Sequence, residues 1–234
     1  MVEWLAAPID ADRIHAVTWA VSWHGRIMML GWGIIAPLAV IVARFFKVLP
    51  WQNWPTVLDS KLWWRTHWIG LSTVTVMTIA GVAFIWPFSL GGSGHALIGY
   101  TVVVLATLQI VLGIFRGTKG GPTAPAPDGS LRGDHYDMTR RRVAFELAHK
   151  TIGTLLIALA LAALVLGMWE ANAPRWMWLA LAVWWVGLAI AVLLLQRRGY
   201  AMDTYQAIWG PDPTHPGNSR RPIGWGVKRH TVED

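Results

Sequence analysis

The 234-residue chain contains no cysteine. This absence excludes disulfides, thiolate metal sites, iron–sulfur clusters and the Cys-x-x-Cys-His attachment of c-type haem. Charged residues are also scarce at 14%, whereas hydrophobic residues make up 54% of the chain. This composition is not typical of a soluble domain and indicates a chain that is solvated mostly by lipid.

The first sixteen residues lack the pattern of a cleaved signal peptide, which needs a basic start followed by an apolar run. They carry Glu3, Asp10, Asp12 and Arg13 instead. The first apolar segment is therefore expected to remain as an anchor. The 17 tryptophans are a large excess for this length, and Trp collects where a membrane meets water.

Five apolar stretches are long enough to cross a hydrocarbon layer of about 30 Å as helices. They cover residues 16–45, 66–88, 95–115, 145–168 and 176–195. We therefore predict an all-α membrane protein with five transmembrane helices, in which residues 16–198 form the membrane domain. Residues 1–15 form an N-terminal segment. The irregular loop at 117–133 and the tail at 199–234 are rich in Pro and Gly.

Basic residues are concentrated on one side of this topology. Of the 20 Lys and Arg, only Arg13 and Arg175 lie in the segments on the N-terminal side, and Arg26 lies inside the first span towards that side. The positive-inside rule then makes the other side cytoplasmic. We expect a periplasmic N-terminus and a cytoplasmic tail, which covers that face, docks on a partner or is loosely ordered. Because the basic residues follow the positive-inside rule, the net positive charge of the chain does not indicate that it binds nucleic acid.

Four of the eight histidines fall one per span, each in the N-terminal half of its helix: His24, His67, His95 and His149. Consecutive spans run in opposite directions. His24 and His95 are therefore expected at one depth, and His67 and His149 at another depth near the opposite side. Two facing imidazoles provide both axial ligands for a haem iron.

Glycines accompany three of these histidines at helical spacing: Gly70, Gly99 and Gly153. They would leave room for a flat macrocycle, although small residues also serve ordinary helix packing. Arg26 and Lys150 are candidate counter-charges for haem propionates, and the alternative for both is snorkelling to lipid head groups. A lone histidine near a helix end is more often an interfacial polar residue, but four matched in depth favour ligation. A zinc or copper site is a weaker alternative, because no span supplies a second ligand at helical spacing.

At these residues the sequence resembles the cytochrome b561 family, in particular its bacterial and DOMON-linked branch. The resemblance rests on the segment His24-Gly-Arg-Ile-Met-Met-Leu-Gly-Trp-Gly, on His95-Ala-Leu-Ile-Gly-Tyr, and on His67 and His149. The resemblance implies a four-helix core holding two b haems, with His24 paired with His95 and His67 with His149. One additional helix completes the five. No DOMON domain is expected in this sequence.

The expected function is transmembrane electron transfer by a di-haem b-type cytochrome, since an iron with two histidine ligands has no open position for a substrate. The donor would be cytoplasmic, ascorbate-like or a quinol, and the acceptor a periplasmic redox partner or ferric chelate, which makes the chain an oxidoreductase of the cytochrome b561 type. The resemblance places it in a bacterial inner (plasma) membrane. The alternative is a haem-bearing anchor subunit of a larger redox complex. A channel or transporter is disfavoured, because the spans carry no paired broken helices.

Overall fold

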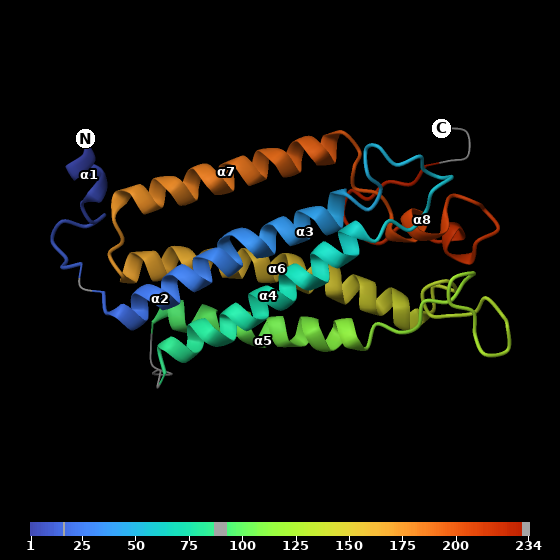
Figure 1. Cartoon of the computed structure of the whole chain (residues 1–234), viewed down its shortest axis with the longest axis horizontal. Helices are drawn as coiled ribbons and strands as arrows, with labels where there is room; N and C mark the ends of the chain where they lie inside the picture. Colours follow the sequence, from blue (N-terminus) through green and yellow to red (C-terminus); the bar gives the residue numbers. More distant parts are fainter. Residues whose placement is uncertain (16, 87–92, 231–234) are drawn as a thin grey trace. The chain divides into compact units, whose positions relative to one another are not determined.

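The computed structural model describes residues 1–15, 17–86 and 93–230. These residues form helices, turns and two isolated β-bridges, without a β-strand among them. Five helical stretches are long and apolar enough to cross a membrane, which confirms the predicted all-α membrane fold. They are labelled in Figure 1, and they occupy Trp19–Phe45, Leu62–Phe84 (α4), Gly94–Ile114 (α5), Arg140–Glu170 (α6) and Arg175–Arg197 (α7).

The predicted spans agree with these helices, with differences at their ends. The fourth span begins five residues earlier than predicted, at Arg140, where the Thr139 hydroxyl accepts a hydrogen bond from the backbone N–H of Arg142. Such a cap starts a helix in the polar interface before the apolar run begins. The predicted limits at Ala16 and Phe88, and most of the loop predicted after the second span, lie outside the described residues.

The first span is not one regular helix. It consists of α2 (Trp19–Met28), the π-helix η1 (Met29–Ile35) and α3 (Ala36–Phe45). The π segment contains Gly31 and Gly33, and the carbonyl of Gly33 accepts a hydrogen bond of 2.8 Å from the Trp184 indole. A π-helix leaves carbonyls poorly matched within the helix, so an indole donor from α7 stabilises this irregularity.

The chain divides into two compact units, and every helix from α3 to α6 contributes to both. Unit 1 comprises Met1–Leu38, Ile69–Ala106 and Leu155–Leu194, and unit 2 comprises Ala39–Trp68, Thr107–Thr154 and Leu195–Asp234. The core of unit 1 gathers Trp32, Ala36, Val74, Val102, Leu156, Ala160 and Leu164. At its centre the Trp32 indole donates to the Thr78 hydroxyl at 3.0 Å, so the one polar edge of this buried ring is satisfied.

The N-terminal segment of unit 1 is fixed to the turn between α6 and α7. The short helix α1 (Val2–Ala6) precedes a β-bridge between Pro8 and Pro174. Asn172, which is 1% exposed, donates from its amide to the carbonyls of Asp10 and Arg13. This buried amide replaces the backbone pairing that a strand would otherwise supply.

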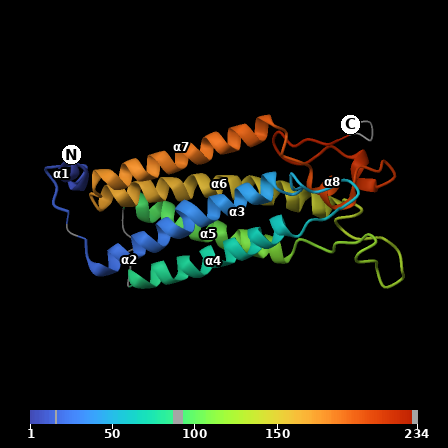
Figure 2. The ribbon, with the colours of Figure 1, turned by 45° about the horizontal axis from the view of Figure 1, so that its top comes forward.

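Unit 2 contains the loop at 116–139 and the tail that follows α7, which Figure 2 shows in yellow-green and in orange to red. The tail includes α8 (Thr204–Trp209) and the 3-10 helix η2 (Pro216–Ser219). All residues of α8 are buried, and Tyr205, Ile208 and Trp209 pack with Met138 in a second hydrophobic cluster. The described part of the tail is therefore folded, and the loosely ordered alternative is wrong for these residues.

Candidate haem-ligand sites

His24 lies on α2 in unit 1, and its ring is held by α4. Its Nδ1 is 2.9 Å from the carbonyl oxygen of Gly81. A carbonyl only accepts hydrogen bonds, so Nδ1 carries the proton and Nε2 has a free lone pair. A hydrogen bond of this kind, from the ring nitrogen that does not bind the metal, orients the histidine ligands of metal sites.

His95, in the first turn of α5, has the same arrangement. Its Nδ1 is 2.9 Å from the carbonyl of Ala163 on α6. Gly167, one turn further along α6, allows this approach, because a Cβ at that position would lie 2.9 Å from Cε1 of the His95 ring. The ring is thus set close against α6, and in the neutral form Nε2 is the nitrogen left to bind a metal.

The structure brings these two histidines together. The ring centroids of His24 and His95 are 5.9 Å apart, and the ring planes are nearly perpendicular at 87°. Both residues belong to unit 1. Each ring is held by a carbonyl of a different helix, so their separation is fixed by packing at two points.

The second pair lies in unit 2. The ring centroids of His67 on α4 and His149 on α6 are 6.1 Å apart, at an interplanar angle of 77°. Phe145, one turn before His149, stacks on its ring with a centroid distance of 5.2 Å. The backbone carbonyl of His149 accepts a 3.1 Å hydrogen bond from Gln109 of α5, which packs these two helices together.

The polar atoms of this second pair are incompletely satisfied. Nδ1 of His67 and Nδ1 of His149 are buried and have no hydrogen-bond partner among the described residues. The Ala39 carbonyl lies near the His67 ring but does not satisfy this Nδ1. Buried ring nitrogens are rarely left in this state without a bound ion or ligand.

The spacing of both pairs fits a single iron between two imidazoles. Metal–imidazole bonds are about 2.0 Å long, and adding about 1 Å from each nitrogen to its ring centre gives centroids about 6 Å apart. The observed separations are 5.9 and 6.1 Å. No group of three or more His, Cys, Asp and Glu side chains with metal-site spacing occurs among the described residues, so a tetrahedral site built from protein ligands alone has no candidate there.

The three predicted glycines follow their histidines by one helical turn. A Cβ built at Gly99 would meet no atom within 4 Å, and one at Gly153 would meet only Gln109 Nε2, at 3.8 Å. Gly70 is half-buried on α4. The space beside Gly99 and Gly153 is therefore open to a flat ligand.

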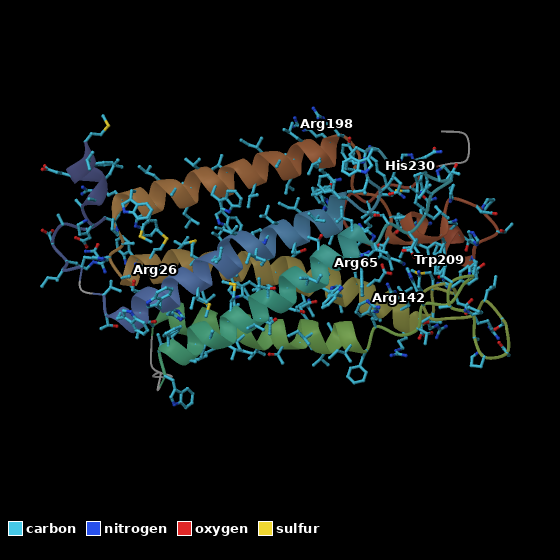
Figure 3. All side chains as sticks on the ribbon, in the orientation of Figure 1. Arg26, Arg65, Arg142, Arg198, Trp209 and His230 are labelled. Atoms are coloured by element: carbon cyan, nitrogen blue, oxygen red, sulfur yellow. The ribbon has the colours of Figure 1, made fainter. Side chains whose placement is uncertain are left out.

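The two predicted counter-charges have different surroundings. Arg26 is exposed on α2, with its guanidinium carbon 5.4 Å from the Trp23 ring centre (Figure 3). Lys150 is already engaged, since its ammonium donates to Glu146 at 2.8 Å and to the Ile223 carbonyl at 2.7 Å. A propionate at Lys150 would have to compete with a buried carboxylate.

Glu146 is the centre of a buried charge cluster in unit 2. It is 4% exposed and accepts hydrogen bonds from Arg142 at 3.0 Å and from Lys150 at 2.8 Å. Figure 3 labels Arg142 on α6 and Trp209 on α8. Since Glu146 precedes His149 by three residues on α6, a fixed negative charge lies within one turn of the second histidine pair.

Two further cations of unit 2 are withdrawn from solvent to different degrees. Lys47, which is 7% exposed, donates to the carbonyls of Arg44 and Met202, both at 3.1 Å. Burial, with the nearby Lys150 ammonium as a lesser cause, lowers the pKa of Lys47 to about 7. The half-buried guanidinium of Arg229 binds Asp203 at 2.6 Å within the tail. The bond between Lys47 and Met202 ties the tail to the segment after the first span.

His135 gave no signal in the sequence, yet it is 3% exposed and packs against the rings of Tyr205 and Trp209. Its Nε2 lies 3.7 Å from Glu146. Burial and, to a lesser degree, the Arg142 guanidinium lower the pKa of His135 to about 3, which outweighs the opposite effect of Glu146.

This buried histidine is expected to make the folded chain less stable in mild acid. Below the unfolded pKa of about 6.5, the unfolded chain binds a proton at His135 that the folded chain excludes, so stability falls as the pH drops towards 3. The slope is about 1.4 kcal/mol per pH unit for one such group. We expect the melting temperature in detergent to fall less between pH 7 and pH 5 for His135→Gln than for the wild type. Equal falls in the two proteins would contradict this assignment.

Curated proteins are similar in sequence to about three fifths of this chain. The chain is 31% identical over 151 residues to human ferric-chelate reductase 1, which covers 62% of this chain and 22% of the human protein. It is 30% identical over 145 residues to a cytochrome b561, DM13 and DOMON domain-containing protein of Arabidopsis thaliana, covering 62% of this chain and 14% of that protein. These relatives support the cytochrome b561 family.

Bovine ferric-chelate reductase 1 is a further relative, at 29% identity over 151 residues. The chain spans less than a third of the length of the curated relatives it matches, with 22% for the human and bovine proteins. No protein-family model matches the chain. No solved structure matches it significantly.

Two residues that position the first histidine pair were missed in the sequence, namely Gly81 and Gly167. Gly81 supplies the carbonyl that binds His24, and Gly167 makes room for His95. Both lie near the C-terminal ends of their helices, α4 and α6. Applying the alternating helix direction to glycines as well as histidines would have placed them at the depth of His24 and His95.

Proposed function

We propose that this chain is a di-haem b-type cytochrome that passes single electrons across a membrane. His24 and His95 would be the axial ligands of one haem, and His67 and His149 those of the other. The observation that carries the proposal is the pair of ring separations near 6 Å, each between histidines of two different helices. The relatives of the cytochrome b561 family support the same cofactor.

The residues of the chain prepare each site for ligation. The carbonyls of Gly81 and Ala163 hold the first pair in the tautomer that presents Nε2. Gly99 and Gly153 leave open space beside His95 and His149, and Gly70 is assigned the same role beside His67. Haem b bound by two imidazoles supplies reversible one-electron chemistry with no open coordination position.

Arg26 and Lys150 are proposed as counter-charges for propionates. Arg26 is exposed and bound to no acid among the described residues, so it is free to take this role. For Lys150 the role requires exchange with Glu146. Arg142 also binds Glu146 and would keep that carboxylate paired during such an exchange.

The proposed location is a bacterial inner membrane, with residues 1–15 in the periplasm, residues 16–198 forming the membrane domain and residues 199–234 in the cytoplasm. The support is the distribution of Lys and Arg, which leaves only Arg13, Arg26 and Arg175 on the N-terminal side. Electrons would enter from a cytoplasmic, ascorbate-like or quinol donor and leave to a periplasmic acceptor. Ferric chelate is the proposed acceptor class because relatives are ferric-chelate reductases by name.

The test of this function is the haem content of the purified protein. We expect a reduced-minus-oxidised difference spectrum of b-type haem, and two haems per chain by pyridine haemochrome assay. An edge-to-face contact between two imidazoles without a metal gives similar ring separations. A folded but colourless protein, purified from haem-sufficient cells, would establish that contact and overturn the proposal.

A further inference from the structure

A cavity of about 400 Å³ lies in unit 2, and none of the four candidate haem-ligand histidines lines it. It is lined by Met138, Val143, Leu147, Arg220, Arg221, Pro222, Ile223 and Gly224. The lining comes from three segments, which are the end of the loop, the first turns of α6 and the tail after η2. Its volume is within the range of small-molecule sites, about 300–1,000 Å³.

One wall of this cavity belongs to the membrane. Val143 and Leu147 are four residues apart on α6 and share a helix face. Leu147 is 60% exposed, and it lies in a helix that is apolar and long enough to cross a bilayer. In a membrane, an exposed leucine of such a span would contact hydrocarbon, and the cavity that it lines would open towards lipid.

The tail contributes two arginines to the lining of this cavity. Arg220 and Arg221 are exposed and form no ion pair among the described residues. Glu146 already binds Arg142 and Lys150, and Asp203 already binds Arg229. The two guanidinium groups therefore present an unneutralised positive charge beside an apolar wall.

The backbone that carries these arginines is fixed at both ends. The Arg220 carbonyl accepts a hydrogen bond from the partly buried Arg229 side chain. The Ile223 carbonyl accepts one from Lys150 at 2.7 Å. A ligand would therefore meet a preformed wall and would have no loop to order on binding.

Helix geometry separates this cavity from the proposed redox site on the same helix. An α-helix turns by about 100° per residue, so Leu147 and His149 differ by about 200° around the axis of α6. The cavity therefore lies on the face of α6 that points away from His149. An occupant of the cavity would not need to exchange electrons with the second histidine pair.

We propose that this cavity binds one anionic phospholipid. The phosphate would bind Arg220 and Arg221, and an acyl chain would lie along Val143 and Leu147. Arginine pairs favour phosphate because their planar N–H groups match its oxygens. Basic pockets at the edge of a transmembrane helix bundle recognise acidic head groups in this way. The inference goes beyond the proposed electron transfer and holds whether or not the chain carries haem.

The experiment is lipid titration of the full-length, delipidated protein in detergent, with bound lipids counted by native mass spectrometry. Dioleoyl-phosphatidylglycerol is compared with dioleoyl-phosphatidylcholine, which has the same chains and no net charge. We expect one phosphatidylglycerol to bind per chain with clear preference. The R220Q/R221Q variant should lose roughly tenfold or more in affinity for this lipid.

The matched control is R197Q/R198Q, which removes another exposed arginine pair of unit 2 that does not line the cavity. It should change the affinity less than twofold. Equal losses in both variants, or equal binding of the two lipids, would overturn the proposal. Complete competition by inorganic phosphate would reassign the site to a free anion, and displacement by a short-chain quinone at lower concentration would reassign it to a quinone.

Discussion

Replacing both His24 and His95 by alanine is expected to remove about half of the b-type haem, the same loss as replacing either residue alone. The reason is that the two rings, 5.9 Å apart in unit 1, would serve one iron. Replacing His24 and His67 together should remove all low-spin haem, because those residues belong to different pairs. The measurement is haem per chain by pyridine haemochrome, with the low-spin signal followed by electron paramagnetic resonance.

A control variant distinguishes the loss of a haem ligand from a general loss of structure. His15→Ala is the matched control, since His15 is an exposed histidine of unit 1 whose ring contacts the Ala171 carbonyl. It should retain two haems. If the His24/His95 double variant lost both haems while its helices remained folded by circular dichroism, the assigned pairing would be contradicted. If His24 and His67 behaved as one site, the different depths predicted for them from alternating helix direction would be wrong.

The five helices could be predicted because apolar runs of about 20 residues have few alternatives in a membrane. Their ends could not, because helix hydrogen bonding continues into the polar interface until a cap stops or starts it. Thr139 at the start of α6 is such a cap. The π-helical segment Met29–Ile35 was also unpredictable, since it is stabilised by Trp184 from a helix far away in the sequence.

Chain direction predicted a shared depth for the histidines of each pair, because parity fixes depth when helices alternate. It did not predict ring separations of 5.9 and 6.1 Å, which depend on which helices are neighbours. The hydrogen bonds of these histidines did not follow either. The carbonyls of Gly81 and Ala163 belong to backbones whose rotation about the helix axis depends on packing. The buried position of His135 was hidden for a similar reason, since it depends on a loop and a tail that meet only in the folded chain.

Electron transfer across a sealed bilayer is expected to require both histidine pairs. A hydrocarbon layer of about 30 Å is too thick for one cofactor near one surface to connect the two aqueous phases. Proteoliposomes that contain ferricyanide and receive dithionite outside should lose the internal ferricyanide colour with the wild-type protein. His24→Ala and His67→Ala should each slow this reaction by roughly two orders of magnitude, towards the rate of empty liposomes.

The control for this prediction is again His15→Ala, which should transfer electrons at the wild-type rate. The measured rates also distinguish a transmembrane electron carrier from an anchor subunit. A wild-type protein with two haems that reduces no internal ferricyanide would favour the anchor subunit of a larger redox complex. A His24→Ala protein that still transfers at the wild-type rate would mean that the first pair lies outside the electron path, because loss of a required carrier cannot be compensated by the other pair across the same hydrocarbon.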